Sequence, residues 1–326
     1  MLAVSSGVLE NFCNSSALFT GCFTAAARRH AEIDALSAMQ STAYSAGPHL
    51  LNLEPQPGGA PPVQRSRWCN LGLWRDGCVE FAPACAALAR ALADAVDLGP
   101  SDSVLDVGVG YAEQALLWAE EFRVRDVLGV EPSAAHVVAA RSLVDGRGLG
   151  GAVRVVRGEA NHLPLEARRA FDVVLSLDSA YHFESRRDFI ASAAELLKPG
   201  GRFGAVDILP CAHGRYGWRW AAQRLVAVAC GIPAPNLHGA AAYVDALRDA
   251  GLGDVEVRRI EGDVFAPFAA YATRQRRRLA PFLSLASRCF LLCVGALFSF
   301  IGRHRLFCVV LITARRTRPE EEALRI

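Results

Sequence analysis

The sequence carries almost no net charge. Its 35 Lys and Arg residues nearly balance its 33 Asp and Glu residues, which leaves a formal net charge of +2 at pH 7. Without a protein-wide field of either sign, the chain has no general attraction for nucleic acid or for an acidic partner. Recognition of a charged ligand must therefore come from a local site.

The 10 Cys residues form no C-x-x-C pair. The sequence thus contains neither a zinc knuckle nor a dithiol redox motif, and we expect no bound metal. The nearest pair, Cys289 and Cys293, has the i,i+4 spacing of a helix face. Reduced, buried thiols are the expectation, and they favour a cytoplasmic protein.

The first 30 residues lack the basic start and the long apolar run of a secretory signal, because Glu10 and Asn11 interrupt the pattern early. The same stretch is rich in Ser and Ala and ends in Arg28 and Arg29. An organelle transit peptide therefore stays open as a second interpretation.

Charged residues make up only 21% of the chain and apolar residues 52%, which excludes a disordered protein. The 28 Gly and 16 Pro residues follow no repeat, so a collagen or coiled coil is excluded too. A length of 326 residues fits one large domain with additions. We predict an N-terminal extension over 1–67, with a helix at about 24–45 and a Pro-rich linker at about 54–67, then a domain over 68–315 and a charged tail over 316–326.

Short apolar runs alternate with helical patterns through the middle of the chain. This alternation predicts an α/β fold with a mostly parallel sheet covered by helices on both faces. The predicted strands are 104–107, 127–130, 153–156, 172–176, 202–208, 254–260 and 306–312. The predicted helices are 82–97, 112–121, 133–145 and 185–197, and a helical cap is expected over about 211–250, with helices at 216–230 and 239–250.

The turn after the first of these strands is rich in glycine. Gly108 and Gly110 allow a sharp turn and a close approach of the backbone to a ligand, and the next helix presents unpaired N–H groups. A dinucleotide site would need a small residue at 113, where this chain has Glu113. Asp106 instead suits a cationic group such as an ammonium, and Glu131 ends the second strand, where a carboxylate can accept ribose hydroxyls. These features predict a nucleotide-like cofactor with a positive charge.

At this point the chain resembles the class I S-adenosylmethionine-dependent methyltransferases, in the branch that acts on small molecules and lipids, which includes sterol, tocopherol and sugar O-methyltransferases. Four segments in the right order carry the resemblance: Asp106 to Ala112 for D-x-G-x-G-x-G, Gly158-Glu159-Ala160 for G-D-A, Leu196 to Phe203 for L-L-K-P-G-G-x-F, and Asn70 to Trp74 for N-x-G-x-W. The chain departs from the family pattern at Ala112, which replaces a glycine, and at Glu159, which replaces an aspartate.

The resemblance implies a Rossmann-like sheet of seven strands, the last antiparallel, and S-adenosylmethionine as the cofactor of an enzyme that methylates O, N or C of a small molecule. The residues implied to hold the cofactor are Asp106, Gly108 and Gly110 at the methionyl end, Glu131 and Pro132 at the ribose, Glu159 and Ala160 at the adenine, and Asp178 after the fourth strand. Two alternatives stay open: a nicotinamide-dependent oxidoreductase, and a non-catalytic binding protein on the same fold.

Two residues are candidates for proton transfer from the acceptor. His182 follows the fourth strand, at the sheet edge where open α/β sheets bind ligands, and titrates near neutral pH. Asp207 ends the fifth strand and would orient His182 or replace it; the resemblance implies such a pair in related sugar O-methyltransferases. Each residue has an alternative role as a cap of a turn or helix.

A basic and apolar segment lies near the C-terminus. Cys289 to Gly302 holds 14 residues without a charge, fewer than the ~20 of a membrane span. Arginines flank it over 274–305, so one interpretation is an interfacial helix on an anionic membrane, and the other is a lid over the substrate pocket. Both interpretations predict a hydrophobic small-molecule acceptor.

Overall fold

The computed structural model of the protein describes residues 49–163, 170–211 and 216–317. The helix predicted at about 24–45, the transit-peptide interpretation and residues 318–326 of the predicted tail lie outside this part of the chain.

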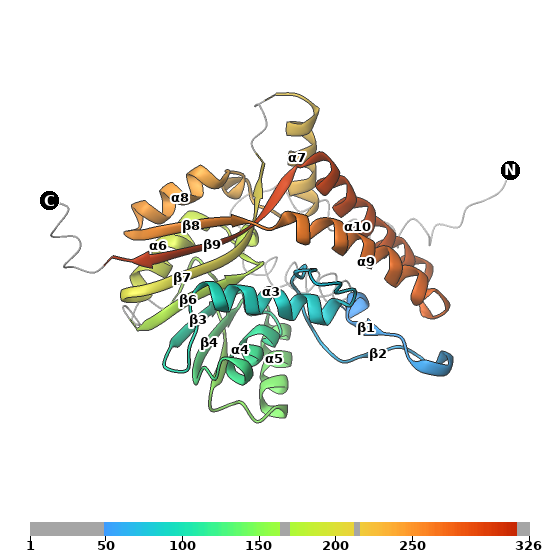
Figure 1. The fold of residues 1–326 in the computed structure, drawn as a ribbon, viewed down its shortest axis with the longest axis horizontal. Helices are drawn as coiled ribbons and strands as arrows, with labels where there is room; N and C mark the ends of the chain where they lie inside the picture. Colours follow the sequence, from blue (N-terminus) through green and yellow to red (C-terminus); the bar gives the residue numbers. More distant parts are fainter. Residues whose placement is uncertain (1–48, 164–169, 212–215, 318–326) are drawn as a thin grey trace, which may run out of the picture.

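Seven strands form one sheet in the order β5-β4-β3-β6-β7-β9-β8 (Figure 1). Neighbouring strands are parallel from β5 to β7, whereas β9 runs antiparallel to both β7 and β8. The expected sheet with its antiparallel last strand is therefore confirmed. The strands are β3 (Ser103–Val107), β4 (Asp126–Glu131), β5 (Val153–Arg157), β6 (Phe171–Leu177), β7 (Leu197–Pro210), β8 (Leu252–Arg259) and β9 (Phe307–Arg316).

Helices cover both faces of the sheet and bury two separate apolar clusters. Local sequence sets where several of them begin: the side chains of Ser133 and Ser185 accept hydrogen bonds from the first turns of α5 and α6 and act as N-caps. One face is covered by α3 (Phe81–Ala95), α4 (Glu113–Glu121) and α5 (Ala134–Gly146), and the other by α6 (Arg186–Leu196) and α8 (Ala240–Asp249).

Three further helices are α7 (Trp218–Ala229), α9 (Phe265–Arg278) and α10 (Leu285–His304). The last two pack side by side as a hairpin that projects from the sheet (Figure 1). Their close approach depends on Gly295, because a Cβ there would lie 2.8 Å from Oγ1 of Thr273. The helix α9 is an addition to the predicted elements, because its apolar start runs directly into the arginines of its last turn and shows no clear helical period.

The structure differs from the predicted domain boundaries at two places. Part of the Pro-rich segment forms a small antiparallel hairpin, in which β1 (Leu53–Glu54) pairs with β2 (Val63–Gln64). The predicted cap over about 211–250 divides: α7 stands away from the sheet, whereas α8 packs on β8 and α6. Buried Tyr243 and Leu247 explain this, since they give α8 an apolar face toward the sheet.

The predicted apolar segment forms α10, whose exposed surface is large. In its most apolar window the mean hydropathy is 1.9 and only 17% of the residues are buried. By length and composition alone it is the one helix in the described ranges that could cross a membrane. The helix α10 has 20 residues, more than the predicted uncharged stretch of 14, because it also includes Arg288 and Arg303 near its two ends.

Candidate active site

The glycine-rich turn between β3 and α4 is left-handed at three positions. Gly108, Gly110 and Ala112 have φ values of 83°, 58° and 68°. A side chain at Gly108 would collide with Ser179, so this glycine is needed for close packing as well as for its φ. At Gly110 the nearest atom to an added Cβ would be Sγ of Cys69, 3.9 Å away. Ala112 adopts the conformation of the glycine that it replaces in the family pattern.

Asp106 lies under this turn, with none of its surface exposed. Its Oδ2 accepts a hydrogen bond of 3.1 Å from Nε2 of Gln114, a partner that the sequence pattern did not identify. Its buried Oδ1 has no hydrogen-bond partner within the described residues. Burial raises the pKa of Asp106 to about 8. A cationic group that donates a hydrogen bond to Oδ1 would stabilise the ionised form of this buried carboxylate.

Glu131, at the end of β4, stabilises the glycine-rich turn. Its Oε2 accepts from the backbone N–H of Gly110 at 3.1 Å, and its Oε1 accepts from the backbone N–H of Ser133 at 3.1 Å. Nδ1 of His136 lies 3.1 Å from the same Oε1. His136 is 4% exposed, and its ring is tilted against that of Tyr111 with 4.4 Å between ring centroids. No motif in the sequence pointed to this histidine.

The three outer residues predicted for the cofactor lie around the end of β5 and the start of α5. Ala160 is buried, whereas Pro132 is exposed and 66% of the Glu159 side chain is exposed. Oε2 of Glu159 lies 3.4 Å from Nδ1 of His162, whose side chain is exposed. Glu159 thus lies at the outer rim of the site, where its carboxylate is accessible to the amino group of an adenine.

Asp178 connects β6 with the segment Asn70 to Trp74. Its Oδ2 accepts a 2.7 Å hydrogen bond from the backbone N–H of Leu71, and burial raises the pKa of Asp178 to about 7. Asn70 fixes the segment by accepting from the N–H of Gly72 at 2.9 Å. Trp74 is 7% exposed and packs on Tyr271 with 5.2 Å between ring centroids. Trp74 is therefore part of the core.

Glu113 explains why the turn does not suit a pyrophosphate. Its Oε1 accepts a 2.6 Å hydrogen bond from the backbone N–H of Arg67, and burial raises its pKa. The side chain occupies the first turn of α4, where a phosphate would need unpaired N–H groups. The residues present fit S-adenosylmethionine better: Asp106 offers a buried acceptor to the ammonium and Glu131 offers a carboxylate beside the left-handed turn.

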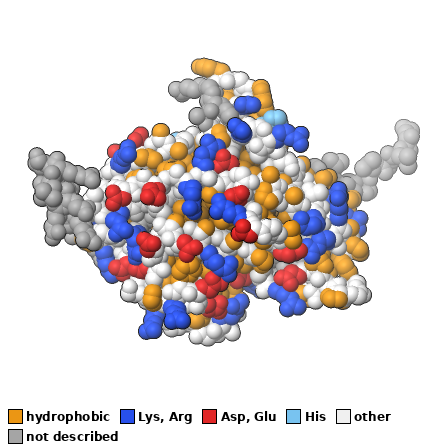
Figure 2. All heavy atoms as spheres, in the orientation of Figure 1, with side chains coloured by type: hydrophobic (Ala, Val, Ile, Leu, Met, Phe, Trp, Pro, Cys, Tyr) orange, Lys and Arg blue, Asp and Glu red, His pale blue; other side chains and the backbone are white. Residues whose placement is uncertain are grey.

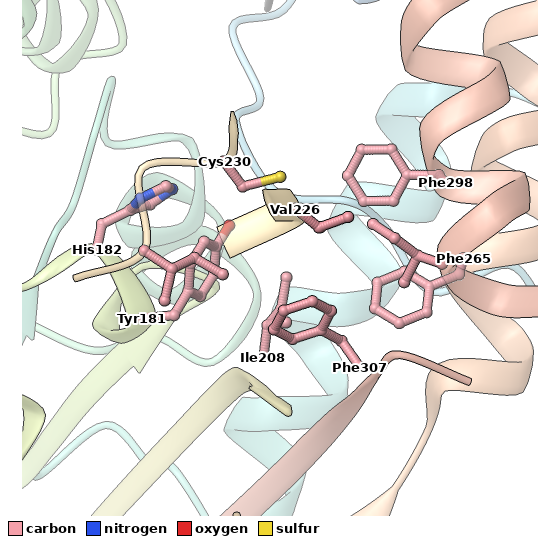
Figure 3. Close-up of a pocket in the computed structure, with 10 residues that line it drawn as sticks. Tyr181, His182, Ile208, Val226, Cys230, Phe265, Phe298 and Phe307 are labelled. Atoms are coloured by element: carbon pink, nitrogen blue, oxygen red, sulfur yellow. The ribbon is translucent and has the colours of Figure 1, made fainter. Parts of the chain in front are cut away.

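His182 lies beside a cavity of about 140 Å³ (Figure 3). Nδ1 of His182 lies 3.3 Å from the carbonyl oxygen of Gly231. Because a carbonyl only accepts, Nδ1 carries the proton in the neutral ring and Nε2 carries the lone pair. Burial lowers the pKa of His182 to about 4. The imidazole is therefore neutral at physiological pH, the state that a general base requires.

The rest of this cavity is almost entirely apolar. His182 and Tyr181 lie at one end, and Phe265 and Phe298 lie at the other (Figure 3). The lining comes from the turn after β6, from β7 and β9, and from α7, α9 and α10 with the segment that follows α7. Its remaining members are Ile208, Val226, Cys230, Ile232, Ile301 and Phe307.

Asp207 does not lie in this cavity lining. It has no exposed surface, and its carboxylate is held by Arg186, with 2.8 Å between Oδ2 and Nε and 3.3 Å between Oδ1 and Nη2. Arg186 in turn donates to the carbonyl of Asn236 at 2.9 Å, and Asn236 donates to the carbonyl of Phe183 at 2.6 Å. The network of Asp207, Arg186 and Asn236 therefore stabilises the turn that carries His182. The carboxylate of Asp207, predicted to orient His182 or replace it as the base, is instead paired with Arg186.

We expect Asp207→Asn to affect stability more than turnover. Removing one partner of a buried ion pair leaves an uncompensated charge on Arg186, so the free energy of unfolding should fall by about 3 kcal/mol, as measured by urea denaturation. The folded fraction should keep a kcat within about tenfold of the wild type. A loss of more than about a hundredfold with SAM binding intact would instead assign the proton transfer to Asp207.

The described residues contain no group of three or more His, Cys, Asp and Glu side chains placed to hold a metal ion. The polar groups around the glycine-rich turn and the cavity include carboxylates, backbone N–H groups and one imidazole. A mostly parallel sheet with a left-handed turn over a buried aspartate, next to an apolar cavity, is the arrangement of a class I S-adenosylmethionine-dependent methyltransferase.

Comparisons with known proteins agree with this class. Residues 105–205 match the family model described as "Methyltransferase domain". The chain is 35% identical over 212 residues to the erythromycin 3''-O-methyltransferase of Saccharopolyspora erythraea, covering 64% of this chain and 69% of that protein. It is 32% identical over 138 residues to the 27-O-demethylrifamycin SV methyltransferase of Amycolatopsis mediterranei, covering 42% and 50% of the two proteins. The chain belongs to the class I S-adenosylmethionine-dependent methyltransferases and acts on small molecules.

Solved structures support the fold. The geranyl diphosphate C-methyltransferase of Streptomyces coelicolor superposes with a TM-score of 0.60 at 21% identity, covering 73% of this chain and 78% of that one. The cyclase SpnF superposes equally well, with a TM-score of 0.60 at 22% identity over 76% and 87% of the two chains. One of these two proteins is a cyclase. A shared fold therefore does not specify the reaction, and the acceptor and the catalytic roles must be argued from the site.

Proposed function

We propose that this methyltransferase methylates a hydroxyl group of a hydrophobic small molecule, with His182 as the general base. The apolar cavity beside His182 carries the proposal. The part of an acceptor that enters this cavity, which is lined mainly by aliphatic and aromatic side chains, gains free energy chiefly by leaving water. A hydrophilic acceptor would lose hydrogen bonds there without replacing them.

The residues of the site divide into two groups by what they would do. Bound S-adenosylmethionine supplies an electrophilic methyl group, and Asp106, Glu131 and the left-handed turn would hold it at the end of β3. His182 would accept the hydroxyl proton on Nε2 while Gly231 keeps Nδ1 protonated. A hydroxyl needs such a base far more than an amine does, because its proton is not lost at neutral pH without one.

The erythromycin 3''-O-methyltransferase and the 27-O-demethylrifamycin SV methyltransferase are named for O-methylation of large natural products. These names support an oxygen acceptor over nitrogen or carbon. The direct test is incubation with labelled S-adenosylmethionine and two panels of hydroxylated compounds matched in size, one lipophilic and one hydrophilic. Methylation confined to the hydrophilic panel would overturn the proposal.

We expect Val226→Phe to reduce kcat/KM for a lipophilic acceptor by about tenfold to a hundredfold, because the larger ring occupies cavity volume. The affinity for S-adenosylmethionine, measured by calorimetry, should stay unchanged. Val138→Phe is the control, since Val138 lies on α5 with 69% of its surface exposed and is not among the residues that line the cavity. Equal effects of the two substitutions would show that the cavity is not the acceptor site.

A further inference from the structure

The helices α7 and α10 both expose large apolar side chains. On α10 the exposed residues form one stripe at helical spacing, with Leu285, Leu292 and Phe300 exposed by 77%, 52% and 39%. On α7, the exposed face carries Leu225 at 72% and Val228 at 61%. Trp218 and Trp220 are also exposed, by 56% and 42%. Patches of this kind on a folded protein mark a surface that contacts something apolar.

The start of α7 and the end of α10 meet, and we call the exposed apolar residues of the two helices the α7–α10 surface. They lie next to each other in Figure 1, and the ring of Trp218 on α7 contacts the ring of His304 on α10 at 5.0 Å between centroids. The surface consists of the exposed residues Trp218, Trp220, Leu225 and Val228 of α7 and Leu285, Leu292 and Phe300 of α10. The same helices, on their inner faces, line the acceptor cavity through Val226 and Phe298.

The distribution of charged residues around the α7–α10 surface indicates what kind of partner it binds. The sequence has no Asp or Glu over 208–244 or over 264–319, although the whole chain is almost neutral. In Figure 2 the lobe of α7 at the top shows hydrophobic and basic side chains and no acidic ones. The exposed basic residues on or next to the surface are Arg219, Arg224, Arg288, Arg303 and Arg305. Arg278 is not counted, since it pairs with Glu80 at 3.0 Å.

Aromatic and aliphatic side chains with arginines beside them suit the interface of an anionic membrane, where the rings enter the headgroup region and the guanidinium groups contact phosphates. A second copy of the chain is a poorer occupant, because self-association would place arginines against arginines. A spanning arrangement of α10 is also disfavoured. Its inner side chains Phe298 and Ile301 form the wall of the cavity, and Gly295 is packed on Thr273.

We propose that the α7–α10 surface docks on anionic lipid bilayers with α10 parallel to the membrane plane, so that a lipid-soluble acceptor enters the cavity from the bilayer. The part concerning the acceptor rests on the proposed function. Docking itself does not, because it depends on the outer faces of α7 and α10 rather than on the site.

The test is sedimentation of the purified full-length protein with vesicles, in the absence of cofactor and acceptor. Vesicles with about one third phosphatidylglycerol should bind the protein, and pure phosphatidylcholine vesicles should bind it at least about tenfold more weakly. Added salt should weaken the binding. The double substitution of Leu292→Glu and Phe300→Glu should lower binding to phosphatidylglycerol vesicles by at least about tenfold.

Val138→Glu is the matched control, because Val138 is 69% exposed on α5, which covers the sheet, and this variant should bind vesicles like the wild type. Calorimetry with S-adenosylmethionine checks that every variant is folded. Absence of binding to phosphatidylglycerol vesicles, or equal binding by the double variant, would overturn the proposal. So would light scattering that shows a dimer dissociated by the same double variant. Vesicle binding together with methylation of hydrophilic compounds only would remove the proposed function and leave docking intact.

Discussion

Asp106→Asn should lower the affinity for S-adenosylmethionine by at least about a hundredfold, because the amide removes the negative charge that faces a cationic ligand in a buried site. The observation behind this is the Oδ1 of Asp106, which is buried and without a hydrogen-bond partner in the described part of the chain. Calorimetric titration with the cofactor is the measurement. Gly110→Val should have a similar effect, since a β-branched side chain is strained at a φ of 58° and occupies the space over the turn.

Asp207→Asn is the control for this experiment, because Asp207 is equally buried and lies in β7, a strand of the same sheet. It should bind S-adenosylmethionine like the wild type once the folded fraction is taken into account. Retained affinity in Asp106→Asn would remove Asp106 from the cofactor site.

The pH dependence gives this prediction a second readout. Burial raises the pKa of Asp106 to about 8, so the group is largely protonated in the free protein at pH 7 and must lose its proton to bind a cation. Affinity should therefore rise as the pH increases from 6 toward 8, and binding should release a proton. Titrations in two buffers with different enthalpies of ionisation measure that proton, and Asp106→Asn should reduce its release.

Most of the fold followed from hydrophobic periodicity. The predicted strand 104–107 is observed at 103–107, and the predicted helix 239–250 is observed as α8 over 240–249. These segments are buried on one or both sides, so their apolar pattern reflects their environment directly. By contrast, α9 combines a buried apolar start with an arginine-rich end, and its helical face becomes evident only when it packs against α10. The small hairpin of β1 and β2 has too few residues to show a period.

The site was predictable where a motif fixes the backbone and not where partners come from distant segments. The glycine turn, Asp106 and Glu131 lie within 26 residues of one another, and the parallel sheet places their strand ends together. The pairing of Asp207 with Arg186 depends on how α6 packs over β7, which no local pattern specifies. The sequence therefore predicted the correct end of the sheet, but it could not show that the carboxylate of Asp207 pairs with Arg186.

His182→Gln should lower kcat by a factor of about 10² to 10⁴ while leaving the affinity for S-adenosylmethionine unchanged, since glutamine cannot accept the hydroxyl proton. Steady-state kinetics with a lipophilic hydroxylated acceptor and calorimetry provide the two measurements. His162→Gln is the matched control: the His162 side chain is 74% exposed at the outer rim of the site, and its loss should not change kcat.

The pH profile separates a base from a residue that merely supports the turn. A base acts in its neutral form, and burial lowers the pKa of His182 to about 4, below the usual value of about 6.5. The wild-type kcat should thus stay level as the pH falls from 8 to 6 and decline only as it approaches the pKa near 4. His182→Gln should lack this acidic decline in its residual rate. If the substitution lowers the midpoint of thermal unfolding but kcat keeps its wild-type value and pH profile, His182 is a structural residue of the turn, and the base must be sought elsewhere in the cavity.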